Sequence, residues 1–156
     1  MIYWFWGYPG VGKDYLAKIF GEITNTLYID GDSLLTNIEK KRLIAGTFSK
    51  EDRLKKLKRI TNYLHKLKKD VIITDSLPDK NSREFLLKSF KKNIIFILVK
   101  SSPLKHKRQL QDRKGHFFKY NMLNKYIKNN WEPVENFPHF ILKNTNKTKR
   151  KLKKSY

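Results

Sequence analysis

Short apolar runs alternate with longer amphipathic segments along this chain. The apolar runs are rich in β-branched and aromatic residues and predict strands at residues 2–6, 26–29, 71–74, 94–99 and 140–142. Apolar positions at helical spacing predict helices at residues 15–22, 34–45, 50–67, 81–90, 103–113 and 121–128. This alternation favours an α/β fold, a parallel sheet covered on both faces, with ligands gathering at the carboxyl ends of the strands.

The first predicted strand leads directly into a glycine-rich loop, which is made of Gly7, Tyr8, Pro9, Gly10, Val11, Gly12, Lys13 and Asp14. A Gly-x-x-x-x-Gly-Lys pattern between a strand and a helix is typical of a phosphate-binding P-loop, so we expect these residues to bind ATP. Position 14 departs from the pattern, which has a Ser or Thr whose hydroxyl holds Mg²⁺. A carboxylate can coordinate Mg²⁺ directly, but it adds negative charge beside the triphosphate.

Acidic residues end the second and third predicted strands, at Asp30-Gly31-Asp32 and at Asp75-Ser76. Asp32 can accept the proton of an attacking hydroxyl, and it can equally cap the helix that follows. Asp75 has the position of a second Mg²⁺ contact and Ser76 can touch a substrate, although turn chemistry explains both residues as well. We therefore predict a catalytic role for Asp32 and metal contacts at Asp14 and Asp75.

Basic residues at two places suit anionic ligands. Arg53, near the start of the long helix, offers a guanidinium, although an arginine on a charged helix is more often solvated. A second cluster surrounds Gly115 and contains Arg108, Arg113, Lys114, His116 and Lys119. Phosphoryl transfer needs positive charge over the γ-phosphate, and a mobile lid can supply it while excluding water. The alternative interpretation is a basic surface loop.

Composition narrows the class of protein. A length of 156 residues with 39% hydrophobic content fits one domain, which we place at residues 1–143, followed by a basic tail at residues 144–156. The tail is either a fraying helix or a disordered basic arm. The absence of cysteine excludes disulfides and cysteine-based metal sites, and we expect a cytoplasmic protein that does not enter a membrane. The sequence leaves a homodimer open.

The formal net charge is +21, which has two interpretations. It suits a nucleic-acid partner, or it reflects a lysine-rich composition combined with steering of anionic substrates. We favour the second because the lysines are scattered along the helices as well as clustered.

The chain resembles the small P-loop kinases of the gluconokinase, shikimate kinase and adenylylsulfate kinase group, from residue 1 to about residue 143. Its most specific match is to the lid of gluconokinases, at residues 113–119, Met122-Leu123 and Glu132-Pro133. Residues 3–5, 48–53 and 132–138 resemble adenylylsulfate kinases instead. Lys56 departs from both, because it stands where adenylylsulfate kinases have an Asn, and Lys55-Lys56 stands where gluconokinases have Pro-Trp.

This resemblance implies a P-loop NTPase of the nucleoside-monophosphate-kinase type, with about five parallel strands, flanking helices and a helical lid. It implies ATP with Mg²⁺ and transfer of the γ-phosphoryl group to a hydroxyl of a small anionic acceptor. A gluconate-like acceptor is our first choice and adenylylsulfate the second. The alternative is a polynucleotide 5′-hydroxyl kinase or a nucleotide-dependent nucleic-acid binder. Because of Asp14, a third interpretation stays open, in which the protein is a degraded kinase that binds nucleotide without turnover.

The resemblance also distributes roles among single residues. Catalysis is assigned to Lys13, Asp32 and Arg113, and Arg108 joins the P-loop in binding ATP. The acceptor would be bound by Asp32, Arg53, Ser76, Arg83, Lys114 and His116.

Overall fold

A parallel sheet forms the centre of the protein in a computed structural model that describes residues 1–112 and 120–145. Its strand order is β2-β3-β1-β4-β5, and every neighbouring pair is parallel. The strands are β1 (Ile2–Trp6), β2 (Leu27–Asp30), β3 (Val71–Asp75), β4 (Ile94–Lys100) and β5 (Phe140–Lys143). The predicted α/β fold with a five-stranded parallel sheet is confirmed.

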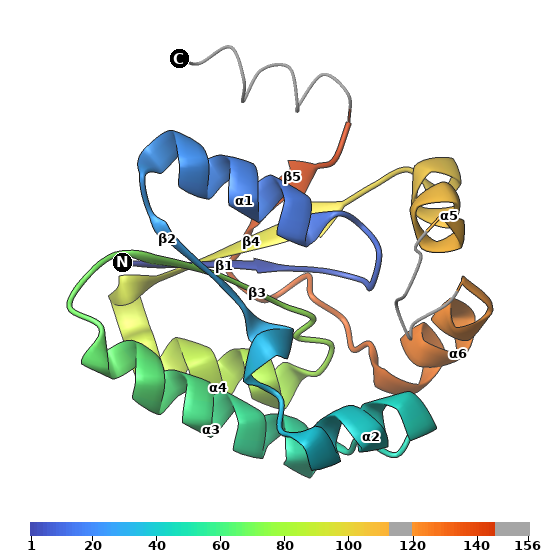
Figure 1. Cartoon of the computed structure of the whole chain (residues 1–156), viewed down its shortest axis with the longest axis horizontal. Helices are drawn as coiled ribbons and strands as arrows, with labels where there is room; N and C mark the ends of the chain where they lie inside the picture. Colours follow the sequence, from blue (N-terminus) through green and yellow to red (C-terminus); the bar gives the residue numbers. More distant parts are fainter. Residues whose placement is uncertain (113–119, 146–156) are drawn as a thin grey trace.

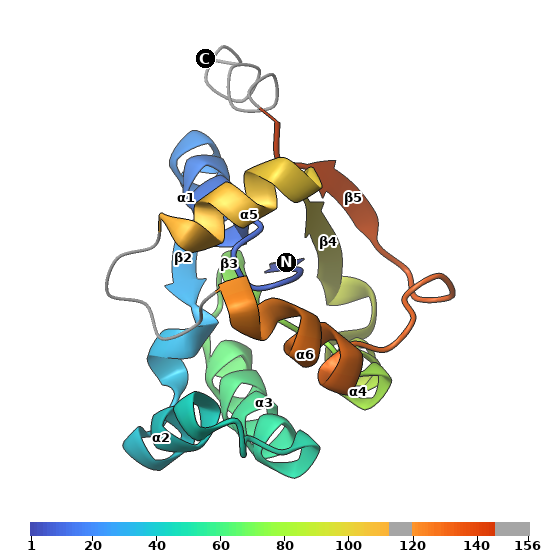
Figure 2. The ribbon, with the colours of Figure 1, turned by 90° about the vertical axis from the view of Figure 1, so that its right-hand side faces the viewer.

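Helices cover both faces of this sheet. Figure 1 shows α1 on one face, α3 and α4 on the other, and α5 and α6 beside the carboxyl ends of the strands. Figure 2 shows α2 extending from the same end of the molecule as α3. The helices are α1 (Lys13–Thr24), α2 (Asn37–Ala45), α3 (Lys50–Lys66), α4 (Lys80–Phe90), α5 (Pro103–Gln111) and α6 (Tyr120–Asn130). Within the two described ranges, none of them is long and apolar enough to cross a membrane.

The segment expected to be one helix at residues 34–45 divides into two elements. A 3₁₀ turn covers Gly31–Leu34, and α2 begins only at Asn37. Thr36 causes this division, because its hydroxyl accepts a hydrogen bond from the Glu39 N–H while the Glu39 carboxylate accepts one from the Thr36 N–H. Such a capping box fixes the start of a helix, so the residues before it form a separate turn.

The core is built from alternating side chains of the strands. In β1, Trp4 and Trp6 pack into the cluster beneath α3 and α4, whereas Phe5 packs into the cluster beneath α1. All three side chains are fully buried. Because successive strand residues point to opposite faces, a single apolar strand anchors both layers of helices. The loop that follows β1 therefore starts from a strand that is packed on both faces.

A buried arginine joins α4 to the segment between α6 and β5. The Arg83 guanidinium donates hydrogen bonds to the backbone carbonyls of Leu77, Pro78, Glu132 and Pro133, and it lies over two aromatic rings. Only 1% of the residue is exposed. Arg83 thus ties together two segments through four carbonyls, one of which, that of Pro78, also accepts from the Glu132 N–H.

We expect Arg83→Met to lower the free energy of unfolding by about 3 kcal/mol, because the variant loses four hydrogen bonds from a buried guanidinium. Urea denaturation measures the change. Lys88→Met is the matched control, since Lys88 is exposed on the same helix, and it should change stability by less than about 0.5 kcal/mol. A loss below about 1 kcal/mol for Arg83→Met would contradict a structural role for this side chain.

Candidate active site

The P-loop connects β1 to α1 in the conformation that its glycines permit. Gly10 and Gly12 have φ values of 82° and 85°, in the left-handed region that side chains disfavour. Gly12 is the N-cap of α1, and Lys13 is the first residue of that helix. The amino end of α1, with its partial positive charge, therefore faces the end of the loop, as a phosphate-binding site requires.

Two side chains from distant elements hold this loop in place. His106 Nε2, on α5, lies 2.6 Å from the Pro9 carbonyl oxygen and donates to it. Asn144 Nδ2, just after β5, donates to the Val11 carbonyl oxygen at 2.7 Å, and its own Oδ1 accepts from Lys105 Nζ at 2.9 Å. Asn144 is 1% exposed, so the first residue of the expected tail is part of the packed fold.

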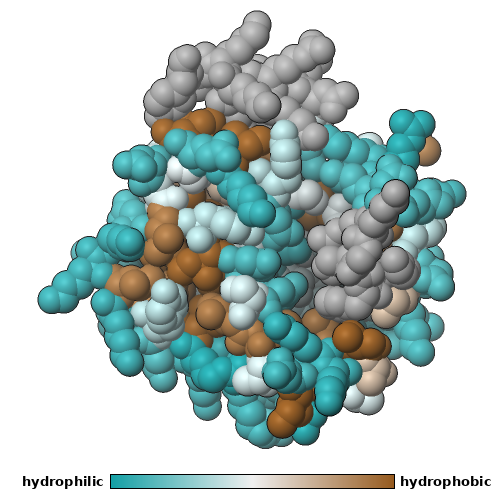
Figure 3. Space-filling view, in the orientation of Figure 1, coloured by the Kyte–Doolittle hydropathy of each residue, from teal (hydrophilic) through white to brown (hydrophobic). Residues whose placement is uncertain are grey.

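A cavity of about 540 Å³ opens beside the P-loop, at the carboxyl ends of β2 and β3. Its volume lies within the usual range for small-molecule sites. Figure 3 shows hydrophilic side chains over most of this face of the molecule, with hydrophobic ones gathered in its middle. The cavity itself combines an apolar wall of Leu35, Leu43, Ile44 and Phe48 with a charged lining that includes Lys13, Asp14, Asp30, Asp32, Lys56 and Asp75.

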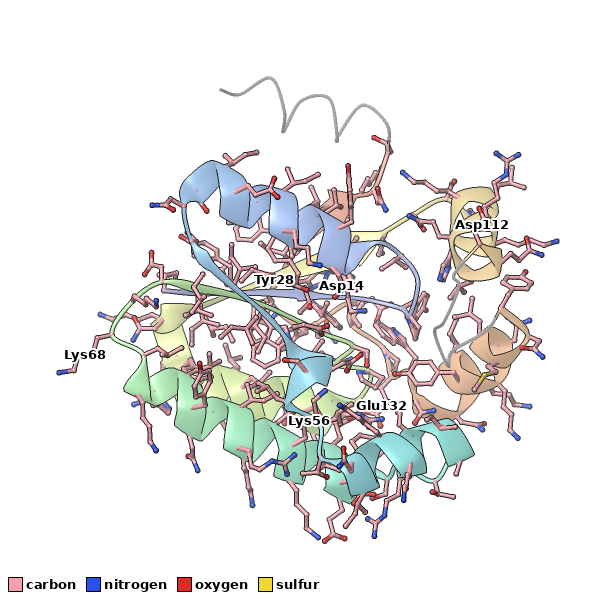
Figure 4. All side chains as sticks on the ribbon, in the orientation of Figure 1. Asp14, Tyr28, Lys56, Lys68, Asp112 and Glu132 are labelled. Atoms are coloured by element: carbon pink, nitrogen blue, oxygen red, sulfur yellow. The ribbon has the colours of Figure 1, made fainter. Side chains whose placement is uncertain are left out.

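Asp14 lies next to Tyr28 at the start of α1 (Figure 4), and the two side chains are hydrogen-bonded. Tyr28 also shares a hydrogen bond of 3.2 Å with the Thr74 hydroxyl. Burial, with the nearby charges of Asp14 and Asp30 contributing, raises the pKa of Tyr28 to about 12. Lys13 Nζ is 3.8 Å from Asp14 Oδ2. The unusual P-loop carboxylate is thus held between a cation and a neutral hydroxyl.

The floor of the cavity contains a buried lysine between two carboxylates. Lys56 Nζ, from α3, lies 2.9 Å from Asp75 Oδ2 and 3.3 Å from Asp32 Oδ1. Burial by itself would lower the pKa of Lys56, but the charges of Asp75 and Asp32 outweigh it and raise the pKa above its ordinary value. Lys56 is therefore an ammonium ion, although only 3% of the residue is exposed.

The structure brings two further predicted residues, Arg53 and Ser76, to the same cavity. Arg53 is buried, and its guanidinium donates to Asp79 Oδ2 at 2.8 Å and to Asn130 Oδ1 at 3.5 Å. The Ser76 hydroxyl accepts a hydrogen bond of 3.1 Å from Tyr126. Arg53 thus reaches the cavity wall with part of its donor capacity already used by the protein.

Other predicted residues lie elsewhere. Arg83 is not among the residues that line the cavity, since its guanidinium is bound to backbone carbonyls. Arg108 is exposed near the end of α5. Arg113, Lys114 and His116 lie outside the described residues, so their expected places in the lid stay predictions.

His106 and Asn144 are among the residues that the sequence did not indicate, and it indicated only part of the role of Lys56. Lys56 carried a usable signal, because it lies on the inward face of α3, four residues before the buried Ile60. A charged residue at such a position needs a buried partner. His106 and Asn144 carried no local signal, since each binds a carbonyl about a hundred or more residues away in sequence.

Comparison with known proteins agrees with this geometry. The family model for adenylylsulphate kinase matches residues 1–127. Among curated proteins, none matches the sequence significantly.

Several solved structures share the fold. A gluconokinase from Sinorhizobium meliloti 1021 has a TM-score of 0.80 at 18% identity, with 97% of this chain and 86% of that chain covered. A sugar kinase from Janibacter sp. HTCC2649 has a TM-score of 0.81 at 18% identity, covering 99% and 91%. The APS kinase CysC of Mycobacterium tuberculosis, in complex with AMPPNP and APS, has a TM-score of 0.69 at 19% identity, covering 99% and 94%.

The fold and the loop define a P-loop kinase, an ATP-dependent phosphotransferase that acts on an alcohol group. By its family model, the chain belongs to the adenylylsulphate kinase family. The resemblance stated from the sequence, to gluconokinase first and adenylylsulfate kinase second, is confirmed at the level of this group.

We expect Gly10→Ala to weaken binding of an ATP analogue by about tenfold or more and to lower the melting temperature. The backbone of Gly10 has a left-handed φ of +82°, which a side chain disfavours, and an added Cβ would overlap the Leu110 side chain. Isothermal titration calorimetry with a non-hydrolysable ATP analogue and thermal unfolding measure the two effects.

Gly46→Ala is the control for backbone strain, because Gly46 has a φ of +72° and no atom within 4 Å of an added Cβ. It should cost about 1–2 kcal/mol of stability and leave nucleotide binding unchanged. Equal nucleotide affinity in both variants would show that the shape of the loop does not determine phosphate binding.

Proposed function

We propose that this protein transfers the γ-phosphoryl group of ATP to a hydroxyl of a small anionic acceptor, with a gluconate-like sugar acid as the first candidate. One observation carries the proposal: Lys13 of the P-loop and Asp32 in the 3₁₀ turn after β2 line the same cavity. A phosphate-binding cation and a proton acceptor on one cavity are the two groups that phosphoryl transfer to a hydroxyl needs.

The residues present fit ATP with Mg²⁺. Gly10 and Gly12 give the loop its left-handed backbone, and Lys13 supplies a cation at the amino end of α1. Asp14 provides the hard oxygen atoms that Mg²⁺ prefers, whereas the two oxygens of Asp75, the other expected metal contact, are engaged by Lys56 and by the Ser76 N–H. Mg²⁺ is usually held by one or two carboxylates together with substrate phosphates. When bound, Mg²⁺ neutralises charge on the phosphates.

The chain's own groups account for the proton and the leaving group. The acceptor oxygen attacks the γ-phosphorus, and the bond from that phosphorus to the β–γ bridging oxygen breaks, so that ADP leaves. The hydroxyl proton passes to Asp32, whose side chain is 49% exposed and can release the proton to water. Lys13 is placed to offset the negative charge of the transferring group.

The lining of the cavity has a polar part and an apolar part, and each part suits one of the two candidate acceptors. The polar floor of Asp32, Lys56, Asp75 and Ser76 offers alternating donors and acceptors, which suit the hydroxyls of a sugar acid. The apolar wall, with Phe48 at its centre, suits a planar base and favours adenylylsulfate as the second candidate. Membership of the adenylylsulphate kinase family supports that second choice as well.

A coupled assay of ADP release across gluconate, shikimate, adenylylsulfate, nucleoside monophosphates and a 5′-hydroxyl oligonucleotide tests the function. We expect turnover with a small anionic acceptor, and we expect Asp32→Asn to lower kcat by about 10²- to 10⁴-fold while the KM for ATP stays nearly constant. If no small acceptor in the panel is phosphorylated, the proposed function is wrong. Turnover with the oligonucleotide alone would favour the nucleic-acid alternative.

We further expect Asp14→Ser to keep or improve activity and to tighten ATP binding. The substitution removes a negative charge beside the triphosphate and restores the hydroxyl typical of P-loops. Initial rates over a range of ATP and Mg²⁺ concentrations measure the effect, with Glu22→Ser, an exposed residue on the same helix, as the charge control. Loss of turnover in Asp14→Ser would instead give the Asp14 carboxylate a specific role in the reaction.

A further inference from the structure

We propose that Lys56 binds the reacting hydroxyl of the acceptor, beside Asp32, and thereby selects what this kinase phosphorylates. The inference rests on the proposed function and adds to it a residue that recognises the acceptor. It also assigns a role to a position where adenylylsulfate kinases, in the resemblance stated above, have an Asn.

Arg53 is the cation that the sequence resemblance assigns to the acceptor. Its guanidinium is paired with Asp79 at 2.8 Å, and both side chains are almost completely buried. Binding an acceptor anion there would require Arg53 to share or break this pair, at the cost of leaving Asp79 as an uncompensated buried carboxylate. Arg53 is therefore better suited to fixing α3 against α4 than to binding substrate.

Lys56 lies three residues further along α3, almost one helical turn from Arg53, and lines the cavity. An ammonium group has three N–H donors. In the described part of the chain, its contacts are Asp75 at 2.9 Å and Asp32 at 3.3 Å. One donor thus has no acceptor among these residues, and because the lysine lines the cavity, a bound oxygen atom can take that place.

Asp32 and Asp75 contribute differently to this arrangement. The Asp75 side chain is 9% exposed and acts as the permanent counter-ion of the ammonium, whereas that of Asp32 is 49% exposed and open to the acceptor. A hydroxyl lying beside this pair can accept a hydrogen bond from the remaining N–H of Lys56 and donate its proton to the Asp32 carboxylate. Lys56 thus orients the oxygen that Asp32 deprotonates.

Charge at the floor also predicts how the acceptor is oriented. One ammonium and two carboxylates carry a net charge of −1, so the floor repels an anion and accepts a neutral hydroxyl. The exposed cations Lys18 and Lys40 also line the cavity, at its rim. The acceptor class is therefore a molecule with its hydroxyl at one end and its anionic group at the other, near these lysines.

The decisive experiment measures steady-state kinetics of Lys56→Met with the acceptor that the panel identifies. We expect acceptor kcat/KM to fall by roughly 10- to 100-fold, as for loss of a charge-assisted hydrogen bond, while the KM for ATP changes by less than about threefold. Lys55→Met is the matched control, because Lys55 is the exposed neighbour on the same helix and pairs only with Glu51 among the described residues. It should leave both parameters unchanged.

Lys56→Met leaves Asp75 buried without a counter-ion, so Lys56→Met/Asp75→Asn is included to remove the unpaired charge. Thermal unfolding shows whether each variant folds. The double variant should recover stability but not acceptor kcat/KM. Acceptor kinetics within about twofold of the wild type in either folded variant would overturn the inference and leave the proposed function intact. A wild-type chain that phosphorylates no small acceptor would overturn the proposed function, and the inference with it.

Discussion

The fold depends on giving every buried cation a partner at one end of the sheet. Arg53, Lys56 and Arg83 are all less than 9% exposed, and they meet carboxylates, carbonyls or both. An unpaired charge at any of these places would cost several kcal/mol. The pairs therefore do more than add stability, because they determine how α3, α4 and the segment before β5 must sit together. The cavity exists where these constraints leave space.

The same principle explains the two unusual charges of the site. Asp14 adds a negative charge beside the P-loop, and Lys56 adds a positive charge at the floor of the cavity. Each is held by neighbours: Asp14 by Lys13 and Tyr28, and Lys56 by Asp32 and Asp75. A P-loop kinase can thus keep its fold while the charges that face its substrates are rearranged. Recognition of the phosphate and recognition of the acceptor are separable in this architecture.

The sequence predicts the order of strands and helices and the P-loop, because periodicity and glycine patterns are local properties. It fails where the outcome depends on a distant partner. Arg83 looks like a ligand for an anion, yet its guanidinium is bound to backbone carbonyls, and Arg53 lines the cavity with part of its donor capacity used by Asp79. The amino-acid pattern alone does not distinguish a cation that is available to bind substrate from one that is already paired within the folded protein.

Asn144 links the last strand to the first loop. Its amide reaches the Val11 carbonyl across 133 positions of sequence, and its carbonyl oxygen accepts from Lys105. The P-loop therefore lacks one of its supports until β5 has joined the edge of the sheet beside β4. A change that detaches this edge strand would therefore also disturb the loop that binds the nucleotide.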